Sequence, residues 1–125
     1  MQIRESAEDY LEAILILKND NGNVRSIDIA HRLGFTRPSV SIAMKHLREG
    51  GYINVSEDAL ITLTPKGLAI AERVYERHQV LTGCLLALGV DEEHAKADAC
   101  RIEHDLSEES FGRIKLFYEE RLRQL

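Results

Sequence analysis

The stretch "SIDIAHRLGFTRPSVSIAMKHL", residues 26–47, sets the architecture of the chain. It predicts two short helices joined by a tight turn. The first is capped by Ser26 and ended by Gly34, which can adopt the left-handed turn conformation, and the second is capped by Thr36. Pro38 is tolerated because it falls in the first turn of the second helix, where its missing N–H costs no hydrogen bond. This pattern is typical of a helix-turn-helix.

The segments on either side extend the motif. Upstream, a helix is expected to start at Ser6, as an N-cap followed three residues later by Asp9, and to end at the turn 19–23, "NDNGN". Downstream, β-branched residues alternate on both sides of "SEDA", which predicts a hairpin from about Tyr52 to Leu63. A helix-turn-helix followed by a hairpin makes a winged helix. The side chains expected to face its core are Tyr10, Leu11, Ile14, Leu15, Leu17, Ala30, Val40, Ala43 and Leu47.

The chain becomes helical again from Pro65 onward. Three further helices are expected, over 67–89, 91–107 and 107–125. The predicted fold is therefore mainly α with a small β-hairpin. It has an N-terminal winged helix-turn-helix domain at 1–66 and a C-terminal helical domain at 67–125. The last helix carries more apolar surface than a small domain can easily cover, which indicates a homodimer.

Composition narrows the function further. The 125 residues carry a formal net charge of −5, but basic residues gather in the winged-helix segment while most acids lie in the helical one. No apolar run approaches the roughly 20 residues needed to cross a bilayer, and the N-terminus is charged rather than leader-like, so a cytoplasmic protein with reduced thiols is expected. On the second helix of the motif, hydroxyl and cationic side chains face outward, suited to phosphates and base edges in a major groove. They are Arg37, Ser39, Ser41 and Lys45.

The stretch "CRIEHDLS", residues 100–107, suggests a metal site. On a helix, residues three and four apart share a face, so Cys100, Glu103 and His104 would direct a thiol, a carboxylate and an imidazole toward one point. Three residues do not complete such a site. Asp9 and Glu12, one turn apart on the first helix, are further candidates.

At this point the chain resembles the metal-dependent repressors of the diphtheria-toxin-repressor and manganese-transport-regulator type. The resemblance covers nearly the whole chain, and the order and spacing of its parts make it specific. It depends on "EDYLEAI", "IDIAHRLGFTRPSVSIAMKHL", "LTPKG", "RHQVL", "LGVDEEHAKADACRIEHDLS" and the final amphipathic helix.

The resemblance implies a ligand set for two divalent ions per subunit. The positions that match the ligands of the manganese-type regulators are Asp9, Glu12, His78, Glu103 and His104, with Glu103 able to bridge both ions. Cys100 departs from that pattern, because the manganese regulators have a carboxylate there and the iron regulators a cysteine. The iron type in turn has methionine at the position of Asp9, an acid at that of Thr82 and a histidine at that of Lys96, which argues against its ancillary site.

The function that follows is a metal-responsive, DNA-binding transcriptional repressor of metal-ion homeostasis, and not an enzyme. Mn(II) or Fe(II) is expected to activate binding of a homodimer to an inverted-repeat double-stranded DNA operator, because ligands from both domains would hold the domains together. Two alternatives remain. One is a winged-helix regulator that senses an oxidant or an organic ligand through Cys100. The other is a dinuclear metallohydrolase, for which no acid/base or oxyanion residue is evident beside the ligands.

Overall fold

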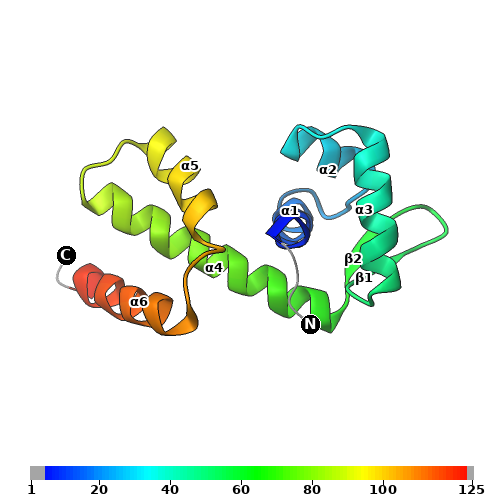
Figure 1. Cartoon of the computed structure of the whole chain (residues 1–125). Helices are drawn as coiled ribbons and strands as arrows, with labels where there is room; N and C mark the ends of the chain where they lie inside the picture. The colour runs from blue at the N-terminus through cyan, green and yellow to red at the C-terminus, as the bar shows by residue number, and fades with distance from the viewer. Residues whose placement is uncertain (1–4, 124–125) are drawn as a thin grey trace. The chain divides into compact units, whose positions relative to one another are not determined.

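Six helices and one hairpin make up the residues that the structure, a computed structural model, describes: 5–123 (Figure 1). The elements are α1 (Glu5–Asn21), α2 (Ser26–Leu33), α3 (Arg37–Glu49), β1 (Ile53–Val55), β2 (Ile61–Leu63), α4 (Pro65–Ala87), α5 (Glu92–Ile102) and α6 (Glu108–Arg123). They form two compact units, one extending to Arg73 and the other beginning at Val74, so the division falls inside α4. The predicted mainly α fold with one small hairpin is confirmed.

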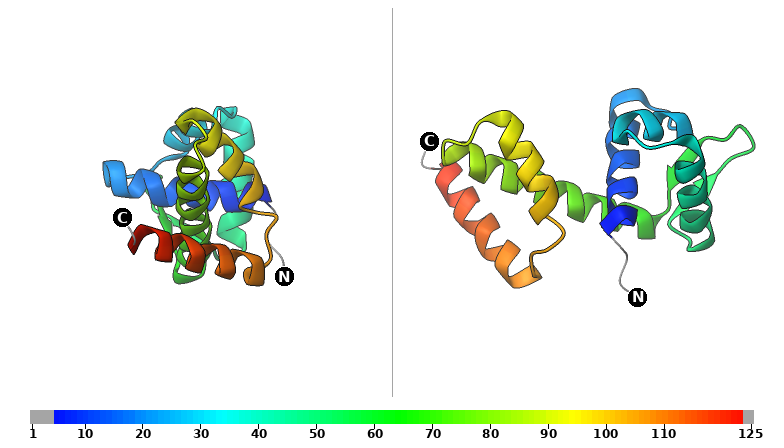
Figure 2. Two further views of the ribbon diagram at one scale, coloured as in Figure 1. Left: turned by 90° about the vertical axis from the view of Figure 1, so that its left-hand side faces the viewer. Right: turned by 45° about the horizontal axis from the view of Figure 1, so that its top comes forward.

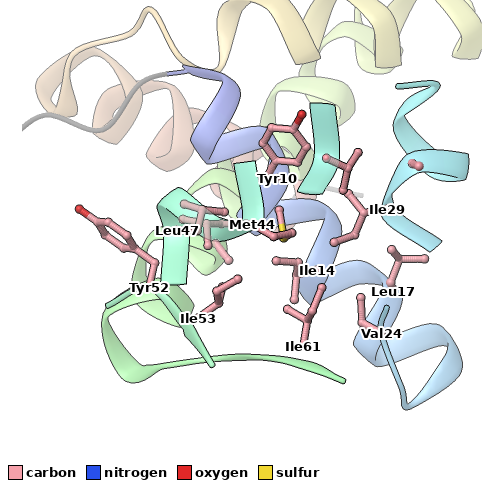
Figure 3. Close-up of a cluster of buried hydrophobic side chains, with 14 residues drawn as sticks. Tyr10, Ile14, Leu17, Val24, Ile29, Met44, Leu47, Tyr52, Ile53 and Ile61 are labelled. Carbon is pink, nitrogen blue, oxygen red and sulfur yellow. The ribbon is translucent and has the colours of Figure 1, made fainter. Parts of the chain in front are cut away.

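The first unit is a winged helix. Helices α1, α2 and α3 and the hairpin enclose one apolar core (Figure 3). Strands β1 and β2 pair antiparallel, with Asn54 opposite Thr62, so that Ile53 and Ile61 are both buried. The members of the core include Tyr10, Leu11, Ile14, Leu17, Val24, Ile29, Ala30, Val40, Met44, Leu47, Tyr52, Ile53 and Ile61. The core fixes α3 with one face packed inward and the other left to solvent.

Two of the predicted caps are wrong. Within the described residues α1 covers Glu5–Asn21, so Ser6 lies inside the helix and not at its N-cap. Helix α2 is capped at Arg25, because Asp28 accepts a hydrogen bond from the Arg25 N–H at 2.9 Å and so serves the helix start from inside its first turn.

The start of α3 and the turn before it agree with the prediction. Thr36 caps α3, its hydroxyl accepting from the Ser39 N–H at 3.3 Å. Gly34 ends α2 with a φ of 71°, the left-handed conformation that favours glycine. The turn between the two helices therefore has the conformation that the helix-turn-helix pattern predicts.

The second unit contains the C-terminal part of α4, with α5 and α6 packed on it (Figure 2). The helix expected over 91–107 is shorter than predicted: α5 ends at Ile102, and residues 103–105 form a turn. The N–H of Leu88 donates to the Cys84 carbonyl, and Gly89 has a φ of 97°, which ends α4 and reverses the chain toward α5. Throughout residues 5–123, each helix is too short or too polar to span a bilayer.

Candidate metal centre and nucleic-acid interface

Three side chains of the second unit form a cluster of metal-ligand type. His78 projects from α4, Cys100 from the last turn of α5, and Glu103 from the residue after it. His78 Nδ1 lies 3.0 Å from Glu103 Oε2 and 3.8 Å from Cys100 Sγ. One ligand atom from each residue lies within 4.8 Å of the others. Imidazole, thiol and carboxylate are brought within reach of a single cation.

The backbone explains why Glu103 keeps its place after the helix has ended. Its φ of −61° and ψ of −26° are helical, and its N–H still donates to the Ala99 carbonyl at 3.0 Å. The three-residue spacing from Cys100 therefore continues to act as helical spacing. His104 follows in the turn, with Nε2 3.5 Å from Glu103 Oε1.

The cluster surrounds a carboxylate that solvent does not reach. The Glu103 side chain is 0% exposed, and its Oε1 accepts no hydrogen bond from the described part of the chain. The hydrogen bond to Cys100, then that to Glu103, raises the pKa of His78 from 6.5 to about 10, although partial burial opposes the shift. Cys100 and Glu103 thus stabilise a positive charge beside them, whether on a protonated His78 or on a bound metal ion.

Arg77 holds the backbone beside the cluster. One of its nitrogens, Nη1, donates to the carbonyl oxygens of Glu103 at 3.0 Å and Leu106 at 2.7 Å. The other, Nη2, donates to Glu108 Oε1 at 2.8 Å, and the guanidinium lies 5.0 Å from the centre of the Phe111 ring. Arg77 is 5% exposed. It satisfies the carbonyl of Glu103, the C-cap of α5, and that of Leu106 in the following loop, and so ties α4 to the turn that bears Glu103.

The six predicted ligands are divided between the units. His78, Cys100, Glu103 and His104 belong to the second unit, where the first three form the cluster. Asp9 and Glu12 belong to the first unit. They lie three residues apart on α1 and so share one face of the helix.

The predicted DNA-contacting residues all lie on α3 and are exposed: Arg37, Ser39, Ser41 and Lys45. The hydroxyl of Ser39 accepts a hydrogen bond from Thr36 Oγ1 at 2.9 Å, so it also takes part in the helix cap. The opposite face of α3 packs into the core through Val40, Met44 and Leu47. The helix therefore presents its cations away from the core.

One residue of this face was missed in the sequence analysis. Ile42 is 60% exposed on α3, the highest value among the large apolar side chains described in the first unit. At 100° per residue it points about 160° away from Val40, near the centre of the outward face. The signal was present in the helical spacing, but an isoleucine draws attention as a core residue rather than as a contact.

A winged helix with a cationic outward helix face, followed by a helical unit with a thiol, imidazole and carboxylate cluster, defines the class of metal-responsive DNA-binding proteins. Comparison with known proteins gives the family. The sequence profile "Iron dependent repressor, N-terminal DNA binding domain" matches residues 2–59, and "Iron dependent repressor, metal binding and dimerisation domain" matches residues 64–123.

Curated relatives agree with these matches. "Transcriptional regulator MntR" of Escherichia coli O6:H1 is 39% identical over 114 residues, which cover 91% of this chain and 74% of the relative. "Uncharacterized HTH-type transcriptional regulator MJ0568" of Methanocaldococcus jannaschii is 37% identical over 117 residues, covering 92% and 94%. The chain belongs to the iron-dependent repressor family, which includes regulators named MntR.

Solved structures share the fold. The manganese regulator SloR superposes with a TM-score of 0.81 at 25% identity, over 95% of this chain and 55% of that one. A manganese-dependent transcriptional repressor in complex with manganese gives 0.82 at 27% identity, over 90% and 52%. The chain thus spans about half the length of these two proteins. The predicted function, a metal-responsive DNA-binding transcriptional regulator, is confirmed at the level of the family.

Proposed function

We propose that this chain is a repressor whose operator binding is activated by Mn(II) or Fe(II) held at the His78–Cys100–Glu103 cluster. That cluster is the observation that carries the proposal. A carboxylate without solvent exposure needs a compensating charge, and Glu103 Oε1 lacks a hydrogen-bond donor among the described residues. The residues present therefore fit a divalent cation, which when bound would supply that charge and keep the thiol deprotonated.

The donor chemistry supports the choice of metal. Carboxylates suit Mn(II), imidazole suits most first-row transition ions, and a thiolate favours Fe(II), Zn(II) or Co(II) over Mn(II). The full ligand set that we propose contains three carboxylates, Asp9, Glu12 and Glu103, and one thiol, Cys100. We therefore rank Mn(II) slightly ahead of Fe(II), and expect Zn(II), which prefers four tetrahedral ligands, to activate only in part.

The full ligand set and the number of ions belong to the proposal as well. We include His104 as a ligand because its imidazole lies beside Glu103. We propose two ions per subunit because each of the two Glu103 carboxylate oxygens could bind one ion. Asp9 and Glu12 are included as adjacent hard donors on α1. Because they belong to the first unit, their coordination would restrict the DNA-binding unit and so couple metal to operator affinity. Titration calorimetry should give two ions per subunit for the wild type and one for Glu12→Gln.

The direct test measures operator binding by fluorescence anisotropy, in excess Mn(II) and in chelator. We expect tight binding only with metal, and His78→Ala should need more metal for the same binding. His94→Ala is the matched control, since His94 is exposed and paired with Asp91. Equal affinity in chelator and in metal would remove the activation mechanism.

For the dimer, we propose an interface on α4 and α6. A groove of ≈500 Å³ lies between these helices, lined by apolar side chains such as Leu85 and Ile114. Two of its lining residues, Leu88 and Phe117, are 79% and 68% exposed, and a second copy of the chain would remove this apolar surface from water. The family's C-terminal domain is described as a dimerisation domain, which supports this occupant.

A two-fold dimer calls for an operator with two-fold symmetry. We propose an inverted repeat whose half-sites lie about 34 Å apart or a multiple of that, so that both copies of α3 enter the major groove from one side of the duplex. Arg37 should contribute, as an exposed cation on the first turn of α3. Arg37→Ala should weaken operator binding by about 1–3 kcal/mol and leave metal affinity unchanged. Arg101→Ala, at an exposed arginine of the second unit, is the control; equal operator affinity in the two variants would mean that Arg37 makes no contact.

The remaining parts of the proposal concern domain limits and location. We place the functional boundary between residues 66 and 67, a few positions after the gap between the two profile matches at 60–63 and before the division of the compact units at Arg73 and Val74. A regulator of transcription acts where the chromosome is, so we propose a cytoplasmic location and a regulatory rather than catalytic role for the cluster.

Thiol chemistry offers a second candidate function. Cys100 is exposed, and its Sγ lies 3.8 Å from His78 Nδ1, so the thiol is open to a soluble oxidant beside an imidazole. Peroxide could then oxidise the Cys100 thiol to a sulfenic acid, with release of water, and so abolish operator binding without any metal. If peroxide releases metal-free protein from DNA, the oxidant-sensing function is correct; if metal-free protein never binds, that function is excluded.

A further inference from the structure

We infer that Ile42 reads a thymine: its side chain packs against the 5-methyl group of one thymine in each operator half-site. The inference deepens the DNA-binding function proposed above and depends on it. It starts from the exposure of Ile42, 60%, on a helix whose other exposed side chains are mostly polar.

The position of Ile42 on α3 is the first step. Val40, Met44 and Leu47 define the buried side of the helix, and Thr36 fixes where the helix starts. One turn before Ile42 and one turn after it, Pro38 and Lys45 lie on the same outward strip, and both are exposed. Ile42 therefore occupies the middle of the face that would enter a major groove.

The second step is the cost of leaving this side chain in water. Single exposed apolar residues are common on protein surfaces, but Ile42 leaves more than half of its area in water in the middle of a polar helix face, where the fold does not cover it. The cap and the core specify α3 without it, because neither includes Ile42. A contact with a binding partner would remove this apolar surface of Ile42 from water.

The third step is the chemistry of the partner. Four kinds of base pair present edges in the major groove, and the thymine 5-methyl is the apolar group among the hydrogen-bonding ones. Isoleucine has no donor or acceptor, so it cannot read the polar edges. The neighbouring cations Arg37 and Lys45 match a phosphate backbone in charge and would hold the duplex against this face. A nucleic acid is thus favoured over an apolar protein partner.

The test removes one methyl group at a time. A duplex is first selected from random DNA with the full chain in excess Mn(II), and each thymine is then replaced singly by deoxyuridine, which lacks only the 5-methyl. One thymine per half-site should lose affinity about four-fold, the effect of one buried carbon group. In Ile42→Ala the same replacement should have no effect. In Ile27→Ala, at an exposed isoleucine of α2, the four-fold loss should persist.

The outcomes separate this inference from the function on which it depends. If selection enriches no duplex, DNA binding as proposed fails, and Ile42 has no base to read. If a duplex is bound but no deoxyuridine replacement changes its affinity, Ile42 does not contact a thymine. If the loss occurs but persists in Ile42→Ala, another residue makes the contact. Each of the last two results overturns the inference and leaves the proposed function intact.

Discussion

Replacing Arg77 by methionine should lower the free energy of unfolding of the second unit by more than the loss of a surface charge would. Methionine keeps most of the apolar stem of arginine and removes the guanidinium. The structure shows what that group holds: the carbonyl oxygens of Glu103 and Leu106, and the carboxylate of Glu108. The change therefore tests whether the turn after α5 depends on one buried cation.

The magnitude follows from the three contacts. Hydrogen bonds from a charged group contribute about 1.5–3 kcal/mol each when buried, which applies to the two carbonyls. The pair with Glu108 adds little, because the Glu108 side chain is 74% exposed and solvent screens it. Part of the loss is recovered if water reaches the carbonyls, so we expect the free energy of unfolding to fall by about 3–5 kcal/mol, the range seen when one partner of a buried pair is removed.

Urea unfolding of metal-free protein, followed by circular dichroism at a fixed protein concentration, measures this loss. Glu108→Gln is the matched control and should lose less than about 1 kcal/mol. Co(II) titration provides a second readout: Arg77→Met should bind Co(II) more weakly, because the backbone that carries Glu103 is no longer held. Arg77→Lys, which keeps the charge but not the fork of donors, should fall between the two.

A specific result would refute this reasoning. If Arg77→Met unfolds within about 0.5 kcal/mol of the wild type, as an ordinary surface substitution does, the carbonyl contacts contribute no net stability. If it loses stability but binds Co(II) as the wild type does, Arg77 stabilises the helices without positioning Glu103.

Two further changes test the metal and the dimer. Cys100→Glu should move the ranking of activating metals toward Mn(II), because a hard donor replaces a soft one; in anaerobic titrations of operator binding, a ranking equal to that of wild type and of Cys84→Ser would mean that Cys100 is not a ligand. Phe117→Glu should halve the mass measured by light scattering, because a charge would be buried in the proposed interface. Phe35→Glu, which changes a half-exposed phenylalanine of the first unit, should remain dimeric, and a dimeric Phe117→Glu would place the interface elsewhere.

Much of the fold was predictable because its signals are local. The turn at Gly34, the cap at Thr36 and the hairpin between Ile53 and Leu63 depend on residues a few positions apart, whose conformational preferences do not need the rest of the chain. Where two local signals competed, the prediction was wrong: Ser26 is a good cap residue, but the carboxylate of Asp28 completes the cap one position earlier, at Arg25.

The candidate metal centre was also predictable only in its local parts. The spacing of Cys100 and Glu103 on one helical turn is a property of the sequence, and so is the grouping of Asp9 with Glu12. The resemblance to a family, not the spacing, assigned His78 to the same site. Only the packing of α5 on α4 brings His78 to 3.0 Å from Glu103, across 25 positions of sequence, because no local preference links residues so far apart.

Two features were decided by tertiary structure alone. The chain contains many arginines, and the sequence does not distinguish Arg77 as buried; helical spacing relates Ile42 to Val40 but does not say how much of Ile42 the neighbouring elements cover. Burial depends on which helix face the neighbouring elements cover, and that is set by the whole fold. Thus Arg77 became the support of the turn after α5, and Ile42, typical of a core by composition, was left on the outward face of α3.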